Sequence, residues 1–195
     1  MMRATVIHLL RHGKTFANEQ RLYCGQTNLG LSDAGVAALL DLKGQGIYLA
    51  RADLYFTTGL LRTEQTLDLL YGPVQRRPIA GLMEYHFGSF EMKSHEELKG
   101  QQNYQAWLED KTGLAACPGG ESKRDFAKRM SEGFNELLTH AAQKSVLLIC
   151  HGGVIAHFME QNFPAKNNFY GWQPQPGRGY TITIESDGQR RCEQI

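Results

Sequence analysis

Two short apolar runs, each followed by a histidine and a glycine, constrain the fold of this chain most. Residues 5–10 (TVIHLL) and 146–150 (VLLIC) are rich in β-branched and aliphatic side chains, and both end abruptly at polar residues. Runs of this length between loop signals predict strands buried on both faces, as in parallel sheets covered by helices. Ligands bind beyond the carboxyl ends of such strands. If the two strands are neighbours, His12 and His151 lie together at one site.

Segments with helical spacing alternate with these runs. Helices are predicted for residues 32–44, 62–70, 121–143 and 152–162, and short helices for residues 96–109. Further strands are predicted for residues 52–57, 181–185 and 191–194, the last two joined by a turn at Asp187-Gly188.

This alternation predicts an α/β fold: a three-layer α/β/α sandwich with a mostly parallel sheet, an antiparallel edge strand and a small helical cap. The length of 195 residues fits a single domain, residues 1–195. Residues 80–120 are less regular, and we expect them to form the cap as an insertion over one end of the sheet.

Charge and cysteine content exclude several classes of function. Twenty-one basic and 20 acidic side chains give a net charge of +1, which argues against nucleic acid or a membrane surface as a partner. No run approaches the roughly 20 apolar residues of a membrane helix, and the N-terminal residues lack the pattern of a signal peptide. The four cysteines lie far apart and give no metal-ligand spacing. We therefore expect a cytoplasmic protein with reduced thiols and no metal site.

Two arginines near the predicted histidine pair favour an anionic ligand. Arg11 directly precedes His12, where its guanidinium can bind an oxyanion through two hydrogen bonds. Arg62 follows Thr57-Thr58-Gly59 at the start of a helix, where backbone N–H groups already favour an anion. Either arginine alone could be a surface charge, but with the two histidines they indicate a phosphate site. We expect the other histidines, such as His157, to be packed or surface side chains.

Five sequence blocks in this order resemble the signature of the histidine phosphatase superfamily, in its phosphoglycerate-mutase-like branch. They are residues 10–13 (LRHG) with Thr15 and Asn18, residues 53–66 (DLYFTTGLLRTEQT), residues 82–91 (LMEYHFGSFE), residues 118–122 (PGGES) and the strand that ends in His151-Gly152-Gly153. The resemblance covers nearly the whole chain. It departs from the family pattern at Thr58-Gly59, where serine or proline is usual, and at Lys14, which changes the charge at the mouth of the site.

The resemblance implies a phosphomonoesterase that works through a phosphohistidine intermediate and needs neither a cofactor nor a metal ion. His12 would be the nucleophile, and Glu84 would protonate the leaving alcohol and then activate water. A protonated His151 would complete the catalytic set and help to hold the phosphoryl oxygens. The implied phosphate-binding residues are Arg11, Arg62, Asn18 and Thr15.

The choice between phosphatase and mutase depends on the cap. The resembling mutases grip a small acidic diphosphate and tend to have an added basic segment there, whereas residues 85–120 contain three lysines and no arginine. We therefore expect hydrolysis, with a cofactor-dependent phosphoglycerate mutase as the alternative. A non-catalytic phospho-ligand or protein-binding module is an alternative of another class. The presence of both histidines, both arginines and Glu84 counts against it.

Within the phosphatases, residues 21–27 (RLYCGQT) and 90–92 (FEM) resemble the α-ribazole phosphatase group of the cobalamin pathway. The expected partner is a small phosphate ester, with α-ribazole 5'-phosphate as the candidate, and the sequence also allows a homodimer. The candidate substrate-binding residues are Tyr23, Cys24, Gly25 and Gly152, and Arg178 is expected near the site. Four aromatic residues form either a surface for a nucleoside-like base or part of the core: Tyr23, Phe87, Tyr104 and Trp107.

Overall fold

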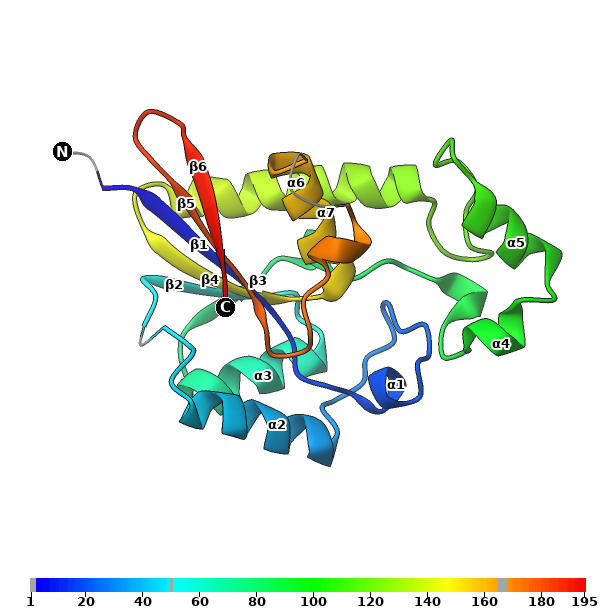
Figure 1. The fold of residues 1–195 in the computed structure, drawn as a ribbon, viewed down its shortest axis with the longest axis horizontal. Coiled ribbons are helices and arrows are strands. Elements are labelled where there is room, and N and C mark those ends of the chain that lie inside the picture. The colour runs from blue at the N-terminus through cyan, green and yellow to red at the C-terminus, as the bar shows by residue number, and fades with distance from the viewer. Residues whose placement is uncertain (1–2, 50, 165–167) are drawn as a thin grey trace.

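A computed structural model describes residues 3–49, 51–164 and 168–195, which fold around one six-stranded sheet (Figure 1). The strands are β1 (Thr5–Arg11), β2 (Leu54–Thr57), β3 (Arg76–Pro78), β4 (Ser145–Cys150), β5 (Gly179–Ile184) and β6 (Arg190–Gln194). Their order is β3-β2-β4-β1-β5-β6, with β3, β2, β4 and β1 parallel and β5 antiparallel to both β1 and β6. The mostly parallel sheet and its antiparallel edge are therefore confirmed.

Helices cover both faces of the sheet and give the predicted three layers. In Figure 1, α2 (Asp33–Gly44) and α3 (Leu61–Tyr71) lie below the sheet, and α6 (Lys123–Ala141) and α7 (Gly152–Asn162) lie above it. None of the described helices is long and apolar enough to cross a membrane.

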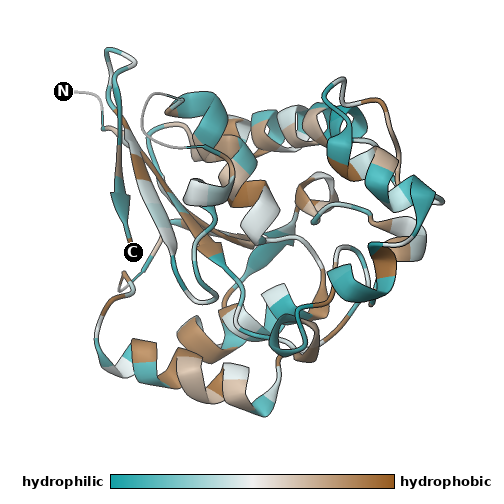
Figure 2. Ribbon diagram, turned by 45° about the vertical axis from the view of Figure 1, so that its right-hand side comes forward, coloured by the Kyte–Doolittle hydropathy of each residue, from teal (hydrophilic) through white to brown (hydrophobic). Residues whose placement is uncertain are grey.

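The unbroken run of apolar residues in β4 explains why helices cover the sheet on both faces. Val146, Leu148 and Cys150 belong to the apolar cluster shared with α6 and α7, whereas Leu147 and Ile149 pack with leucines of α2 and α3. All five side chains are fully buried. Because successive side chains of a strand point to opposite faces, an unbroken apolar run requires a cover on each face. Figure 2 shows apolar ribbon segments concentrated where the helices meet the sheet.

Residues 80–120 lie beyond the end of the sheet, to the right in Figure 1. They form two short 3₁₀ helices, η1 (Ala80–Leu82) and η2 (Gly88–Phe90), and two helices, α4 (His95–Leu98) and α5 (Gln102–Glu109). Backbone hydrogen bonds from Tyr23 N–H to the Lys93 carbonyl and from Met92 N–H to the Tyr23 carbonyl tie this segment to the loop after α1 (Phe16–Glu19). A further 3₁₀ helix, η3 (Tyr170–Trp172), precedes β5.

One strand differs from the sequence prediction for a clear physical reason. No strand is predicted at Arg76–Pro78, because its side chains are charged and it ends in proline; such a strand is tolerated at the sheet edge, where β3 lies. The short helices predicted at 96–109 are α4 and α5, which are separated around Gly100. Each helix has its own start, and α4 begins with a capping box of Ser94 and Glu97.

Candidate active site

The sheet topology brings the two strand tips together. β1 and β4 are parallel neighbours with Arg11 opposite Cys150, and the His12 N–H donates to the Cys150 carbonyl at 3.0 Å. His151 is the N-cap residue of α7, and its ring lies edge-on to that of His12 with centroids 5.2 Å apart. Both imidazoles are buried. The structure thus places His12 and His151 side by side, as the two apolar runs predict.

The hydrogen bonds of His12 define its tautomer. Its Nδ1 lies 2.6 Å from the carbonyl oxygen of Gly13. A carbonyl can only accept, so Nδ1 carries the proton and Nε2 keeps its lone pair. The Nε–H of Arg62 donates to that lone pair at 3.2 Å. The free nitrogen of His12 therefore faces a guanidinium.

Arg62 is held by the loop that follows α1. Its Nη1 donates to the Thr27 carbonyl at 2.9 Å and its Nη2 to the Gly25 carbonyl at 2.5 Å. The side chain is almost completely buried on the first turn of α3. Three hydrogen bonds fix the plane of the guanidinium, so that it has little freedom to turn away from His12.

Arg11 is held between the segment before β5 and the start of α7. Its Nη1 donates to the carbonyl of Pro174 at 2.8 Å, in the segment before β5. Its Nε is buried and has no hydrogen-bond partner among the described residues. A Cβ at Gly152 would lie 3.1 Å from Cζ of Arg11, so glycine at the start of α7 lets the guanidinium approach the backbone of that helix.

His151 has one partner and one unsatisfied nitrogen. Its Nε2 lies 2.9 Å from the hydroxyl oxygen of Thr58, directly after β2. Its Nδ1 is buried without a hydrogen-bond partner in the described part of the chain. Buried polar atoms are nearly always hydrogen-bonded, and an exception requires an explanation such as a bound ion. Arg11 Nε and His151 Nδ1 are two such exceptions at one site, and both can act as donors.

Burial and positive charge control the protonation of the histidines. Burial, Arg62 and Arg11 hold the pKa of His12 well below its ordinary value of 6.5. Burial, followed by Arg62 and His12, holds the pKa of His151 well below the same value. The surroundings therefore favour two neutral imidazoles. The protonated His151 that the family resemblance implies requires additional negative charge, which a phosphate dianion would supply.

The side chain of Glu84 contacts the first turn of α7, close to the histidine pair. Its Oε2 accepts from the Gly153 N–H at 2.8 Å and its Oε1 from the Tyr85 N–H at 2.9 Å. A Cβ at Gly153 would lie 2.5 Å from Oε1 of Glu84, so only glycine leaves room for the carboxylate in this position. The carboxylate is half-buried and lies between the arginine-histidine cluster and a large cavity.

Thr15 and Asn18, predicted as phosphate ligands, form the capping box of α1. The Asn18 Oδ1 accepts from the backbone N–H and the hydroxyl of Thr15, at 3.0 and 3.1 Å. A contact with a phosphoryl group would therefore fall to the Asn18 amide nitrogen. Lys14 is exposed. Burial raises the pKa of Tyr48 to about 12, and the positive charge of Arg178 opposes that rise. The backbone carbonyl of Arg178, however, accepts from the Arg11 N–H at 2.9 Å.

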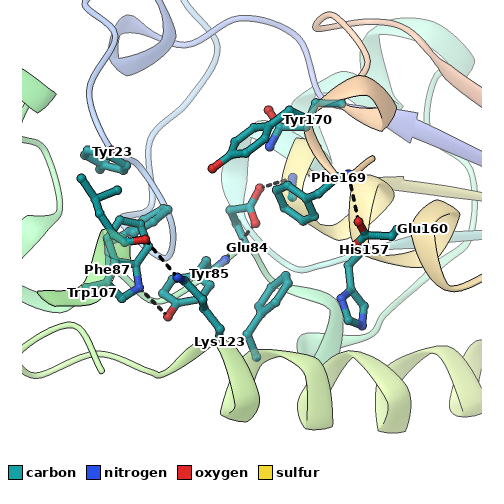
Figure 3. Close-up of a pocket in the computed structure, with 14 residues that line it drawn as sticks. Tyr23, Glu84, Tyr85, Phe87, Trp107, Lys123, His157, Glu160, Phe169 and Tyr170 are labelled. Atoms are coloured by element: carbon teal, nitrogen blue, oxygen red, sulfur yellow. Dashed lines mark hydrogen bonds between the residues drawn. The ribbon is translucent and has the colours of Figure 1, made fainter. Parts of the chain in front are cut away.

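A cavity of about 480 Å³ opens beside Glu84 (Figure 3). Half of the residues that line it are aromatic: Tyr23, Tyr85, Phe87, Trp107, Phe126, Phe169 and Tyr170. Polar groups come from α7, where Gly153, His157 and Glu160 share one helix face, and from Lys123 of α6. Glu160 also accepts from the Phe169 N–H at 3.0 Å and so holds the segment before η3. His157 is packed against Phe126, as expected, and it also lines the cavity.

The four predicted aromatic residues divide into two groups. Tyr23, Phe87 and Trp107 line the cavity, whereas Tyr104 is fully buried in the core. The Tyr104 hydroxyl lies 2.6 Å from that of Tyr23 and 2.7 Å from Nδ1 of His95. Tyr104 therefore supports the cavity from behind, through Tyr23 and through the ring of Trp107.

Cys24 and Gly25 belong to the loop that holds Arg62. Burial raises the pKa of the half-buried Cys24 thiol, and its Sγ–H points to the Thr27 carbonyl. A Cβ at Gly25 would lie 1.6 Å from the Tyr85 carbonyl oxygen. Gly25 is thus required for close contact between this loop and the Glu84 segment.

Sequence reasoning does not identify three residues that organise this site. Thr58 contacts His151, Glu91 accepts hydrogen bonds from the loop that holds Arg62, and Arg129 contacts the backbone around Glu84. Glu91 lies within a block that resembles the family, but its spacing carries no information on its partners. Arg129 shares its helix with other charged residues, and no pattern distinguishes it from a surface side chain. Among the described residues, no group of three His, Cys, Asp or Glu side chains could hold a metal ion.

Comparison with known proteins gives a consistent result. The chain is 30% identical over 154 residues to the adenosylcobalamin/alpha-ribazole phosphatase of Escherichia coli K12, covering 76% of this chain and 74% of that protein. It is 28% identical over 157 residues to the 2,3-bisphosphoglycerate-dependent phosphoglycerate mutase 2 of Gloeobacter violaceus, covering 75% of this chain and 70% of that protein. The crystal structure of the alpha-ribazole phosphatase from Shigella flexneri superposes with a TM-score of 0.83 at 25% identity, covering 97% of this chain and 95% of that one. The sequence profile of the histidine phosphatase superfamily (branch 1) matches residues 7–194, and the chain belongs to this family.

Proposed function

We propose that this protein is a phosphomonoesterase that hydrolyses a small phosphorylated metabolite through a phosphohistidine on His12. The observation that carries the proposal is a pair of buried nitrogens without hydrogen-bond partners, Arg11 Nε and His151 Nδ1, next to a neutral histidine. Arg62 adds a third group, since its Nε–H donates directly to the His12 Nε2 lone pair. A phosphoryl group bonded to that nitrogen would satisfy them.

The reaction has two steps. His12 Nε2 attacks phosphorus, the bond from phosphorus to the ester oxygen breaks, and Glu84 gives its proton to the leaving alcohol. Water then attacks the phosphohistidine, Glu84 takes a proton from that water, and the bond between phosphorus and Nε2 breaks to release phosphate. Throughout, Arg11, Arg62 and a His151 protonated in the presence of the dianion hold the phosphoryl oxygens. Positive charge comes from side chains, so the proposal needs no metal ion or cofactor.

The cavity supports hydrolysis of an aromatic ester over mutase activity. Its volume is within the usual range for small-molecule sites, and half of the residues that line it are aromatic. The lysine that lines it, Lys123, donates to the carbonyl of Asp110 at 2.8 Å and lies 5.7 Å from the centre of the Trp107 ring. Glu84 and Glu160 add negative charge. A second phosphate or a carboxylate on the substrate would meet these carboxylates without a free arginine.

We propose α-ribazole 5'-phosphate as the substrate. The aromatic cavity beside Glu84 suits the flat base of such an ester, and the E. coli relative carries this activity in its name. A cofactor-dependent phosphoglycerate mutase remains the second candidate, because the G. violaceus relative is named as one. We propose that residues 80–120 act as a cap over this cavity within a single domain. A cytoplasmic location and a homodimer stay predictions, to be measured by fractionation and light scattering.

The first test is phosphate release from a panel of esters in the presence of EDTA. The panel contains α-ribazole 5'-phosphate, 3-phosphoglycerate with and without a 2,3-bisphosphoglycerate primer, sugar phosphates and p-nitrophenyl phosphate. We expect strong release from α-ribazole 5'-phosphate and none that depends on a metal ion. Primer-dependent isomerisation of 3-phosphoglycerate would favour the mutase, and no turnover of any ester would favour a non-catalytic binding module.

His12→Ala tests the nucleophile. We expect the variant to fold, as judged by circular dichroism and its melting temperature, and to lose turnover of every ester. In the wild-type protein, rapid acid-free quenching with a ³²P-labelled ester should trap an acid-labile phosphoprotein that the variant lacks. Turnover at the wild-type rate in the variant would remove His12 from this role.

Glu84→Gln tests the general acid. The substitution keeps the shape of the side chain but not its proton, so kcat/KM should fall about 10²- to 10⁴-fold for benzyl phosphate, which has a poor leaving group. For p-nitrophenyl phosphate, whose leaving group needs no proton, kcat/KM should change far less. Equal losses for the two esters would show that Glu84 is not the acid.

A further inference from the structure

Arg129 contacts the backbone on which Glu84 is carried. It lies on α6, and its Nη1 donates to the carbonyls of Gly81 and Met83 at 3.0 and 2.8 Å. Its Nη2 donates to the carbonyl of Glu84 itself at 3.2 Å. One guanidinium therefore holds three carbonyls in the short stretch that runs from η1 to the proposed acid.

Glu121 completes the contact from the other side. Its two oxygens accept from Nη2 and Nε of Arg129, at 2.5 and 3.2 Å. Its Oε1 also accepts from the His86 N–H at 2.8 Å, two residues after Glu84. The Tyr85 hydroxyl donates to the Glu121 backbone carbonyl at 2.7 Å. The peptide groups before and after Glu84 are thus tied to one ion pair.

The backbone of the Glu84 segment lacks regular secondary structure. Residues 83–87 form neither a helix nor a strand, so no regular hydrogen bonding fixes their backbone. The ion pair is largely shielded from water, since side-chain exposure is 23% for Arg129 and 13% for Glu121. Both partners use nearly all their hydrogen-bonding groups on this segment or on each other. An ion pair that only stabilised the surface would not need to bind the carbonyl of Glu84.

We propose that Arg129 and Glu121 are positioning residues that fix the Glu84 carboxylate beside the ester oxygen. This inference rests on the proposed function, because it takes Glu84 as the general acid. A carboxylate displaced by about 1 Å loses its alignment with the leaving oxygen, which can cost about 100-fold in rate. Lysine cannot replace Arg129, since its ammonium is a point donor without the planar fork that reaches three carbonyls and a carboxylate.

The experiment compares leaving groups in Arg129→Lys. We measure kcat/KM for benzyl phosphate and p-nitrophenyl phosphate in the wild type, Glu84→Gln, Arg129→Lys and the double variant Glu84→Gln/Arg129→Lys. Arg129→Lys should lower kcat/KM for benzyl phosphate about 10- to 100-fold and for p-nitrophenyl phosphate only a few-fold. The double variant should show no further selective loss beyond Glu84→Gln, because Arg129 acts through Glu84.

Arg76→Lys is the matched control. Arg76 is likewise a half-buried, ion-paired arginine, held by Asp68 at 2.6 Å and by Glu64 at 3.3 Å, but it lies on β3. The substitution Arg76→Lys should change neither the kcat/KM for each ester nor the ratio of the two kcat/KM values. If Arg129→Lys does not fold, Glu121→Gln is measured in the same way, and it should show the same selective loss.

The outcomes separate this inference from the proposed function. Equal losses on both esters in Arg129→Lys, no loss at all, or full additivity in the double variant would overturn the positioning role while leaving Glu84 as the acid. If Glu84→Gln itself shows no dependence on the leaving group, the acid assignment is wrong, and the role of Arg129 falls with it.

Discussion

Glu91→Gln should destabilise the protein and weaken phosphate binding together. The Glu91 Oε2 accepts from the Gly25 N–H, the Thr27 N–H and the Thr27 hydroxyl, at 2.9, 3.4 and 2.7 Å. Its Oε1 accepts from the N–H groups of Gln26 and Phe87, at 3.0 and 3.1 Å. Five donors thus converge on one half-buried carboxylate. The same loop offers the carbonyls that hold Arg62.

The magnitude follows from the number of donors left without an acceptor. An amide must place its NH₂ group against one of the two sets of donors, and the smaller set holds two N–H groups. Each buried donor without an acceptor costs about 1–3 kcal/mol. Because Glu91 is only half-buried, water can satisfy part of this loss, so we expect about 2–4 kcal/mol in total. For a domain of this size, that lowers the melting temperature by about 5–15 °C.

The assay combines thermal unfolding with titration of inorganic phosphate. We expect the lower melting temperature together with about a tenfold weaker affinity for phosphate, since Arg62 loses the rigid carbonyls that hold it. Glu96→Gln is the matched control: Glu96 is exposed on α4, where it pairs with Lys99, and its replacement should alter neither quantity. A melting temperature within about 2 °C of the wild type would refute the reasoning, because it would show that leaving two of the five donors without an acceptor does not destabilise the fold.

Two further predictions concern the start of α7 and the effect of pH. Gly153→Ala should displace the Glu84 carboxylate, because the added Cβ would lie 2.5 Å from Oε1. The variant should therefore have a lower kcat/KM for benzyl phosphate than for p-nitrophenyl phosphate, relative to the wild type, with little change in melting temperature. An unchanged ratio of the two kcat/KM values would contradict this prediction. Stability should fall as the pH is lowered below 6.5, because burial holds the pKa values of His12, His151, His8 and His157 below that of the unfolded chain, which therefore binds more protons. Melting temperatures from pH 7.5 to 5 should show this loss, and inorganic phosphate should reduce it; a constant melting temperature would count against neutral, buried histidines.

The sequence predicts those parts of the fold that depend on periodicity. The apolar run in β4 and the amphipathic pattern of α6 each specify one structure, since no other arrangement buries their side chains. β3 could not be predicted, because a three-residue strand with two arginines forms only through its pairing with β2. The division between α4 and α5 likewise depends on a single glycine and a local cap, which are weak signals in a region without strong periodicity.

The site divides in the same way. His12, Arg11 and His151 could be placed from the sequence because they follow apolar strands, and strand order alone brings them together. Arg129 and Glu91 act on backbone groups more than 30 residues away, and contacts of that kind leave no spacing in the sequence. Thr15 and Asn18 show the opposite case. Their spacing fits a ligand site and a helix cap equally well, and the structure uses both side chains in the cap.

The electrostatics of the site have one common cause. Arg62 is buried and Arg11 is half-buried, with few anionic partners, so that desolvation lowers their own pKa values as well as those of both histidines. Isolated buried charge is costly, and a fold that retains it must recover the energy elsewhere. Glu84 offsets part of this charge, yet it is already engaged by two backbone N–H groups. A phosphate dianion would neutralise both arginines, satisfy the two orphaned donors and favour a protonated His151 in one step. The same excess charge that destabilises the isolated fold would therefore make the site selective for a dianionic ester.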